Sequence, residues 1–227
     1  MPLFIIFVEC GIELVPKEIR KHSAVRKNLS EHIYSSQLLD NALHHSAMKN
    51  LENREKRGRP DISHLCLLNA LGSPLNKCGY IRLYLHTINN KIFEFNPDIR
   101  IARNYNRFKG LMAKLLIDSK IGINGNRLIS EVKSNLQALI RTFNDPDIIL
   151  FSHKGELVID YNEIFLNDAS KDTVAIIGGF QKGNFSDDIL ALSKKKISIS
   201  HYPLDAWIVT NKIITYYELS NKISLKL

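Results

Sequence analysis

The segment TVAIIGGFQKGNFSDDILALSKKKISISHYPLDAWIVTNKIITYYEL, residues 173–219, contains two short apolar runs, each followed by a loop, and then a long helical pattern. Val174–Ile177 is apolar with β-branched residues, which is typical of a strand buried on both faces. Gly178, Gly179 and Gly183 follow where this strand should end. Glycine tolerates positive φ and lets backbone amides approach a ligand closely. The pattern therefore predicts a strand followed by a ligand-binding loop.

The second half of this segment repeats the arrangement. Ile197 and Ile199 alternate with Ser198 and Ser200 and predict a short strand, after which His201–Pro203 turns the chain into a helix from about Leu204. Two such loops at the ends of adjacent parallel strands would form a pocket of main-chain donors and acceptors. A structural turn is the alternative for the glycine loop alone. A dinucleotide-binding loop is disfavoured, because the spacing is not GxGxxG and the loop lies near the C-terminus.

Periodicity predicts the remaining elements and places strands in alternation with helices. This alternation indicates an α/β fold with a mostly parallel sheet. The predicted strands are 3–8, 80–87 paired with 91–95 as a hairpin, and 148–151. The predicted helices are 35–51, 62–71 and 128–143, with a loop at 121–126. Ser152–Gly155 follows the strand at 148–151 and is predicted to form a third wall of the pocket.

Composition favours a soluble globular protein with a polyanionic partner. The chain has 227 residues, 44% hydrophobic and 24% charged, with a net charge of +8 and a pI near 9.3. This charge is expected for a protein that binds RNA, DNA or an anionic membrane face, although an ordinary basic surface is equally compatible. The apolar start contains Glu9 and lacks a basic region, so it predicts a first core strand, neither a signal peptide nor a membrane span.

Cysteine and histidine spacing predicts no metal site. Cys10, Cys66 and Cys78 form no CxxC pair, and the first two lie in apolar surroundings, so we expect buried free thiols and a reducing cytoplasm. His44 and His45 are adjacent, whereas a metal-binding helix would normally carry them four residues apart.

Charged residues precede the helix predicted at 62–71. The run ENREKRGRP, residues 52–60, has the composition of a solvated linker, but Asp61 follows at the position expected for an N-cap. Arg59 and Asp61 are therefore expected at a helix start. From the sequence alone, an Asp in this place is more often a cap than a catalytic group.

A second basic cluster lies in DIRIARNYNRFKGLMAKLLI, residues 98–117. Arg100, Arg103 and Arg107 are spaced three and four apart, so on a helix or helical turn they would share one side. Lys109 and interleaved aromatic residues add to the cluster. Because arginine binds phosphate bidentately and stacks on bases, this face predicts an RNA surface, with a solvated basic face as the alternative.

Four motifs in this order identify a family resemblance. IIGGFQKG and ISISHYPLDAW are similar to the cofactor half of the SPOUT (α/β-knot) RNA methyltransferases. RGRPDISHLCLLNALGSPLNK and FNPDIRIARNYNRFKGLMAKLL resemble the ribosome-biogenesis branch, of Nep/Emg type, which methylates a pseudouridine in small-subunit ribosomal RNA. The match is weakest at 119–145. It implies one SPOUT domain over 1–227, with a small β-hairpin/helical insertion at about 80–100 and a C-terminal trefoil knot at about 147–219.

The resemblance also implies a chemistry. The methyl donor would be S-adenosylmethionine, bound by Gly178, Gly179, Gly183, Ile197, Ser198, Ile199, Ser200, His201, Tyr202 and Leu204. The acceptor would be N(1) of a pseudouridine, with Asp61 orienting the base or accepting its proton and Arg59 stabilising charge or gripping a phosphate. Arg59, Arg100, Arg103, Arg107 and Lys109 would bind small-subunit ribosomal RNA in the cytoplasm. No metal and no membrane is implied.

The helix from Leu204 suggests an assembly state. It carries more apolar and aromatic residues than one face of a terminal helix needs: Leu204, Trp207, Ile208, Ile213, Ile214, Tyr216 and Tyr217. This surplus predicts a homodimer, as in similar knotted methyltransferases, although packing on two sides within one subunit is the alternative. Two other functions remain open at this stage: a non-enzymatic rRNA-binding assembly factor, and a nicotinamide or flavin oxidoreductase.

Overall fold

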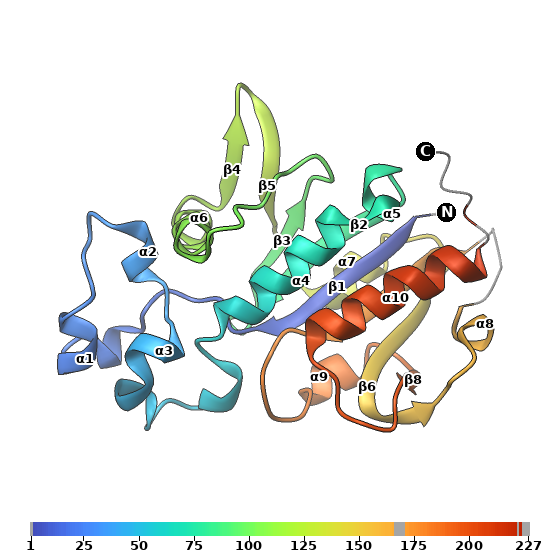
Figure 1. Ribbon diagram of the computed structural model, residues 1–227. Helices are drawn as coiled ribbons and strands as arrows, with labels where there is room; N and C mark the ends of the chain where they lie inside the picture. The colour runs from blue at the N-terminus through green and yellow to red at the C-terminus, as the bar shows by residue number, and fades with distance from the viewer. Residues whose placement is uncertain (1, 166–170, 222, 224–227) are drawn as a thin grey trace.

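The computed structural model in Figure 1 describes residues 2–165, 171–221 and 223. Its centre is an eight-stranded sheet with the order β4-β5-β3-β2-β1-β7-β6-β8. The strands are β1 Leu3–Cys10, β2 Ile81–Thr87, β3 Ile92–Phe95, β4 Lys120–Ile123, β5 Asn126–Val132, β6 Asp147–Leu157, β7 Thr173–Gly178 and β8 Lys195–Ser198.

The half of the sheet from β2 to β8 is parallel throughout. In the other half, β3, β5 and β4 add antiparallel pairings. The predicted α/β class with a mostly parallel sheet is therefore confirmed. The hairpin predicted within 80–100 is present as β2 and β3, and β2 belongs to the parallel part of the sheet. The trefoil knot stays a prediction.

One expectation about neighbouring strands was wrong. The two ligand-binding loops were expected on adjacent strands, but β7 and β8 lie on opposite sides of β6. The loop of β6 therefore stands between the other two.

Helices cover both faces of the sheet. The longer ones are α4 Pro60–Gly72, α6 Tyr105–Asp118 and α10 Ala206–Ser220, and Figure 1 shows α4 and α10 crossing the same face. The shorter ones are η1 Lys17–Ile19, α1 Ser23–Arg26, α2 Tyr34–Gln37, α3 Asn41–His44, η2 His45–Met48, η3 Arg54–Lys56, α5 Pro74–Lys77, α7 Leu136–Ile140, α8 Tyr161–Ile164 and α9 Asp187–Leu190.

Alternation along β1 divides the interior into two cores. Ile5 and Phe7 belong to the core under α4, α6 and α10, whereas Ile6 and Val8 belong to the core under α7 and α9. Successive side chains of a strand point to opposite faces, so a strand covered on both faces is apolar throughout. A third, smaller cluster holds the helical segment between residues 15 and 51 together.

The single helix predicted at 35–51 was wrong. The structure has α2, α3 and η2 there, interrupted by an extended piece in which Leu38 bridges to Leu14. Backbone bonds from Val15 N–H to the Gln37 carbonyl and from Leu39 N–H to the Glu13 carbonyl hold this piece. Tertiary pairing therefore overrides the helical spacing of the apolar residues.

The prediction for residues 121–143 was also wrong. A loop and one helix were expected, but β4 and β5 form a hairpin and only Leu136–Ile140 is helical. β5 pairs with β3, which would otherwise be an unpaired edge. Because an exposed edge leaves backbone groups unpaired, the neighbouring strand decides the conformation here.

Two of the three cysteines were predicted to be buried free thiols, and the structure confirms this prediction. Cys10 and Cys66 are buried free thiols, and Cys78 is exposed. Burial raises the pKa of the Cys66 thiol to about 12, so it is a core residue and not a nucleophile.

Candidate active site

A cavity of about 710 Å³ opens where β6, β7 and β8 lead into their loops. Its walls come from three segments: 151–155, most of 177–187, and most of 196–206. The predicted donor-binding residues that line it are Gly178, Gly183, Ile197, Ser198, Ile199, Ser200, Tyr202 and Leu204. The ends of parallel strands are a common ligand site in α/β folds, so the location agrees with the sequence prediction.

The loop after β7, residues 179–185, is called here the donor loop. Gly183 has φ +114, a conformation that L side chains rarely adopt. Phe180 and Phe185 stand edge to face with ring centroids 5.3 Å apart, and both line the cavity. The donor loop therefore depends on a glycine in a conformation that other residues rarely adopt and on an aromatic pair.

Gly179 and His201 are not among the residues lining the cavity. Gly179 is buried, and a Cβ at this position would collide with Cys10. Its N–H donates to the Val8 carbonyl at 2.8 Å. Gly179 thus permits close packing of the strand ends, which is a structural role. His201 is exposed.

The segment Ser152–Gly155 is a bulge within β6 and not a loop after it. Phe151 and Glu156 both pair with Ile197, so the residues between them project from the ladder. All four line the cavity, as predicted. Lys154 Nζ donates to Asn184 Oδ1 at 2.6 Å and thereby joins this wall to the donor loop.

The third wall follows β8 and is shaped by serine hydrogen bonds. Ser198 Oγ donates to the Ser200 carbonyl at 2.8 Å, and Tyr202 N–H donates to Ser200 Oγ at 3.0 Å. These bonds make a tight turn before α10, whose N-cap residue is Asp205. Leu204 and Ala206, on either side of Asp205, both line the cavity.

Arg59 and Asp61 form an ion pair at the start of α4. Arg59 Nε and Nη2 donate to the two carboxylate oxygens of Asp61 at 2.8 and 2.6 Å. Arg59, not Asp61, is the N-cap residue, because Pro60 is the first helical residue. The bonds to Asp61, with a smaller effect from Asp205, raise the pKa of Arg59. Arg59 and Asp61 are both partly exposed, and neither is among the residues lining the cavity.

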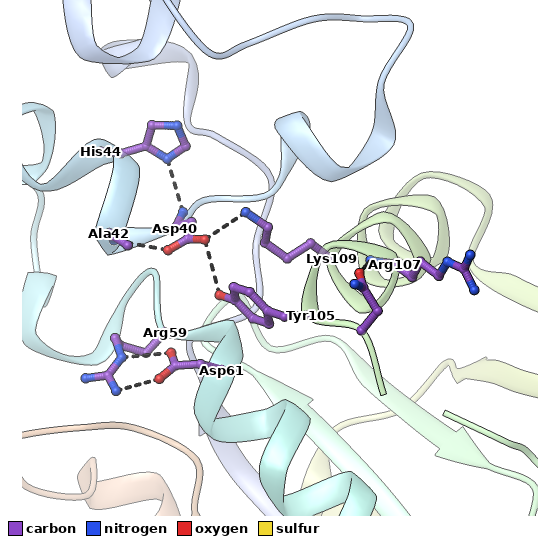
Figure 2. A network of polar contacts seen from close by, with 9 residues as sticks. Asp40, Ala42, His44, Arg59, Asp61, Tyr105, Arg107 and Lys109 are labelled. Carbon is purple, nitrogen blue, oxygen red and sulfur yellow. Dashed lines mark hydrogen bonds and ion pairs between the residues drawn. The ribbon is translucent and has the colours of Figure 1, made fainter. Parts of the chain in front are cut away.

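A buried network around Asp40 supports this region, as Figure 2 shows. Asp40 Oδ2 accepts from Lys109 Nζ at 2.9 Å and from Tyr105 OH at 3.2 Å, and Oδ1 accepts from Ala42 N–H. Burial, with smaller effects of Asp40 and Asp61, raises the pKa of Tyr105. Lys109 was predicted on the RNA surface, but it is only 5% exposed. Its ammonium pairs with Asp40 inside the protein. Lys109 therefore does not belong to the predicted RNA surface.

Arg100, Arg103 and Arg107 are all exposed. The helix expected beneath them is only partly present: Arg107 lies in the first turn of α6, whereas the other two precede this helix. His64 of α4 fixes the preceding segment, since its Nε2 is 2.7 Å from the Ala102 carbonyl and its ring stacks on Phe108. The contacts of His64, and not a continuous helix, therefore position the segment that carries the arginines.

Comparison with known proteins places this site in a family. The family model described as EMG1/NEP1 methyltransferase matches residues 5–218. The chain belongs to the EMG1/NEP1 methyltransferase family. It is 44% identical over 217 residues to "Ribosomal RNA small subunit methyltransferase Nep1" of Staphylothermus marinus, covering 94% of both chains. It is 46% identical over 217 residues to the protein of the same name from Saccharolobus solfataricus, covering 95% of this chain and 96% of that protein.

A solved structure agrees with this assignment. The crystal structure of Archaeoglobus fulgidus Nep1 bound to S-adenosylhomocysteine superposes with a TM-score of 0.86 at 36% identity. The match covers 98% of this chain and 100% of that chain. The mixed α/β fold inferred from the four motifs is therefore confirmed as that of the EMG1/NEP1 family, whereas the knot stays a prediction.

Several residues of this EMG1/NEP1 site were not found from the sequence. Phe180, Phe185 and Asn184 line the cavity, and Asp40 is the centre of the buried network near Arg59 and Asp61. Phe180 and Phe185 lie on either side of Gly183 in the sequence, so both could have been predicted as residues of the donor loop. The contact of Lys154 with Asn184 could not have been predicted, because 30 residues separate them.

The described residues contain neither a cluster of metal ligands nor a membrane-spanning helix. In residues 2–165, 171–221 and 223, no three or more His, Cys, Asp or Glu side chains are grouped to hold a metal ion. No helix in these ranges is both long and apolar enough to cross a bilayer.

Proposed function

We propose that this protein transfers a methyl group from S-adenosylmethionine to N(1) of a pseudouridine in small-subunit ribosomal RNA. Two relatives bear the name of ribosomal RNA small subunit methyltransferase, and the solved relative is bound to S-adenosylhomocysteine, the demethylated donor. The single observation that carries the proposal is the cavity at three strand ends, in which the lining residue Gly183 packs on Glu55 and Lys56, in the segment that leads to Arg59 and Asp61.

The cavity suits the donor in size and in chemistry. Its volume of about 710 Å³ is in the range of small-molecule pockets, roughly 300–1,000 Å³. Apolar side chains such as Ile199 and Leu204 would pack on the adenine plate. Serines of the third wall and the backbone at Gly178 would meet its polar edges. S-adenosylmethionine supplies an electrophilic methyl group on a sulfonium.

The proposed acceptor explains the need for Arg59 and Asp61. Pseudouridine is joined to ribose through carbon, so its N(1) carries a proton. In the transfer the S–CH₃ bond breaks, an N–CH₃ bond forms, and the N(1) proton leaves; the products are S-adenosylhomocysteine and N(1)-methylpseudouridine. A carboxylate with two oxygens has about four lone-pair sites. Asp61 can therefore keep both bonds to Arg59 and still accept the N(1) proton, while the guanidinium stabilises negative charge on the ring.

Arg59, Asp61, Arg100, Arg103 and Arg107 together are called here the substrate-side surface. The three exposed arginines would bind the phosphates around the target, which fixes its position without reading sequence. The target base must leave any stack to reach the methyl group, so a loop or a splayed single strand is the expected substrate.

We also propose a homodimer of single-domain subunits in the cytoplasm. Ile213, Ile214 and Tyr217 of α10 are buried within the chain, so the apolar surplus on this helix is smaller than the sequence indicates. Ile208 and Leu219 remain exposed at 38% and 51%. A two-fold contact that covers them would bring the donor cavity near the seam. Three free cysteines suit a reducing compartment.

Mass spectrometry of small-subunit RNA after incubation with the protein and labelled donor tests the reaction. We expect one labelled methyl group on a pseudouridine. The matched control is the same RNA carrying uridine at the target. N(1) of uridine is bonded to ribose, so no transfer is expected. Label on ribose or on another base would contradict the proposal.

A further inference from the structure

A buried ion pair lies directly behind the donor loop. Lys56 Nζ is 2.8 Å from Glu9 Oε2, and the two residues are 7% and 6% exposed. Neither is among the residues lining the cavity, and the proposed reaction uses neither. A buried pair is costly to desolvate and is weak evidence for stability by itself, so its contacts must explain it.

Glu9 and its neighbour in β1 hold both ends of the donor loop. At the first end, the Val8 carbonyl accepts from Gly179 N–H at 2.8 Å. At the second end, Glu9 Oε1 accepts from Ser186 N–H at 3.2 Å. Because Glu9 Oε2 pairs with Lys56, the carboxylate uses one oxygen for the loop and the other for the ammonium.

The backbone at Glu9 is in an uncommon conformation. Its φ is +53, in the left-handed region that disfavours most side chains. His86 supports it, since Nδ1 accepts from Glu9 N–H at 3.2 Å while Nε2 lies 3.0 Å from Asn90 Oδ1. Burial lowers the pKa of His86, which keeps the ring neutral and able to accept at Nδ1. Such conformations persist where the surroundings impose them, often beside functional sites.

Lys56 contacts the donor loop from outside. Its ammonium lies 4.9 Å from the centroid of the Phe180 ring, a cation–π contact. A Cβ at Gly183 would stand 3.5 Å from Lys56 Cε and 3.3 Å from Glu55 Cγ. On its other side the same segment packs on Gly11, where a Cβ would be 2.6 Å from the Lys56 carbonyl oxygen and 3.0 Å from the Arg59 nitrogen. The segment 55–59 is thus held between β1 and the donor loop.

We propose that Glu9 and Lys56 are positioning residues that hold the donor loop in its donor-binding conformation and link it to the Arg59–Asp61 pair. Arg59 follows Lys56 by three residues, so a movement of the donor loop would be transmitted to the start of α4. The inference rests on the proposed function in one respect only: the donor occupies this cavity.

The link has a thermodynamic consequence. If the donor stabilises the loop and the loop fixes the segment 55–59, donor binding and RNA binding strengthen one another. Coupling of this kind is reciprocal, so the factor by which RNA changes donor affinity equals the factor by which donor changes RNA affinity.

Calorimetry with S-adenosylhomocysteine tests the positioning role. Lys56→Met keeps most of the side-chain length but removes the charge and leaves the Glu9 carboxylate unpaired. We expect the Kd to rise by about tenfold or more and the effect of bound RNA on that Kd to disappear. Lys56→Arg, which restores a cation, should recover most of the affinity. Glu9→Gln keeps an acceptor for Ser186 N–H, so its Kd should lie between those of Lys56→Met and Lys56→Arg. This variant provides a second test of the same ion pair if Lys56→Met does not fold.

Arg57→Met is the matched control. Arg57 forms the neighbouring buried pair, with Nε and Nη2 each 2.7 Å from the Glu13 carboxylate, but this pair does not reach the donor loop. Its loss should lower the melting temperature at least as much as Lys56→Met and leave the donor Kd unchanged.

The outcomes separate this inference from the proposed function. Equal donor affinity in the wild type and in the Lys56→Met protein would overturn the positioning role. An equal loss of affinity in Lys56→Met and Arg57→Met would also overturn it, because stability alone would then explain the effect. A wild-type protein that binds no S-adenosylhomocysteine would contradict the proposed function instead.

Discussion

The donor cavity and the substrate-side surface are built from different kinds of structure. The cavity lies at the ends of parallel strands, and its lining residues come from these strand ends and from the loops that follow them. The substrate-side surface consists of charged side chains at the start of α4, on the irregular segment before α6 and in the first turn of α6. Strand ends are held by the sheet itself, whereas the charged side chains depend on supports such as His64 and Asp40.

This difference predicts whether a substitution should alter donor binding, RNA binding or turnover. A change in the cavity should alter donor binding and leave RNA binding in the absence of donor intact. A change on the substrate-side surface should do the reverse, or should alter turnover alone. The following variants test that separation, from the largest expected effect to the smallest.

Asp61→Asn should have the largest effect, and on turnover. Asn keeps the size of Asp and an oxygen that can accept from Arg59, but it cannot accept the N(1) proton. Loss of a general base typically costs about 10²–10⁴ in rate, so we expect single-turnover methylation to fall by about a hundredfold or more. Donor and RNA affinities should change little. Unaltered turnover would leave Asp61 with a structural role only.

Glu13→Gln is the matched control for Asp61. It weakens the ion pair of Glu13 with Arg57, which is the other carboxylate–arginine pair of this region. This pair lies outside the site. We expect a lower melting temperature with normal single-turnover methylation. Equal losses of turnover in the two variants would show that local folding, and not proton transfer, is responsible.

Gly183→Val should act on the donor alone. A non-glycine residue at φ +114 carries a strain of order 1–3 kcal/mol. The donor loop must then rearrange, and we expect donor affinity to fall by roughly ten- to a hundredfold in calorimetry. RNA affinity in the absence of donor should be unchanged. Gly125→Val, at another left-handed glycine but in the β4–β5 turn, should leave donor affinity unchanged.

Replacing Arg100, Arg103 and Arg107 by Ala should act on RNA alone. Each lost phosphate contact should lower the slope of log K against log salt by about 0.7–0.9. RNA affinity measured by filter binding at several salt concentrations should therefore fall and become less salt-dependent. Calorimetry should show normal donor binding.

A second triple variant controls for the change in net charge. Lys133, Arg141 and Lys194 are exposed and lie beside α7 and α9, which cover the opposite face of the sheet. Their replacement by Ala removes the same charge from the other face. If both triple variants lose the same RNA affinity and salt slope, the net charge and not this surface binds RNA.

The smallest expected effect concerns assembly. This prediction tests whether the donor cavity and the substrate-side surface of one site belong to the same chain or to two chains. Light scattering at micromolar concentration should give about twice the chain mass of 25.9 kDa. Ile208→Asp places a charge on the exposed apolar part of α10 and should yield monomers. Ile123→Asp, on the β4–β5 hairpin and 61% exposed, should remain dimeric. An active wild-type monomer would remove the partner subunit from the proposed RNA site.

Local sequence was sufficient for the donor half of the molecule. Apolar runs of β-branched residues fit only a strand covered on both faces, and the glycines and the turn at residues 201–203 mark where the strands end. The strands and loops of the cavity were therefore predicted in nearly their observed places. Pro60 likewise marks the start of α4, so that Asp61 is the second helical residue and Arg59 is the cap residue.

Only the tertiary structure decided the elements whose partners are distant in the chain. Residues 126–132 became a strand because β3 offered an edge, and residues 37–39 became extended because they pair with 13–15. The same cause turned Lys109 inward, since Asp40, 69 residues away, supplies its counterion. Glu9 and Lys56 meet across 47 residues. Pairings of this kind depend on which segments the fold brings together, and local propensity carries no information about them.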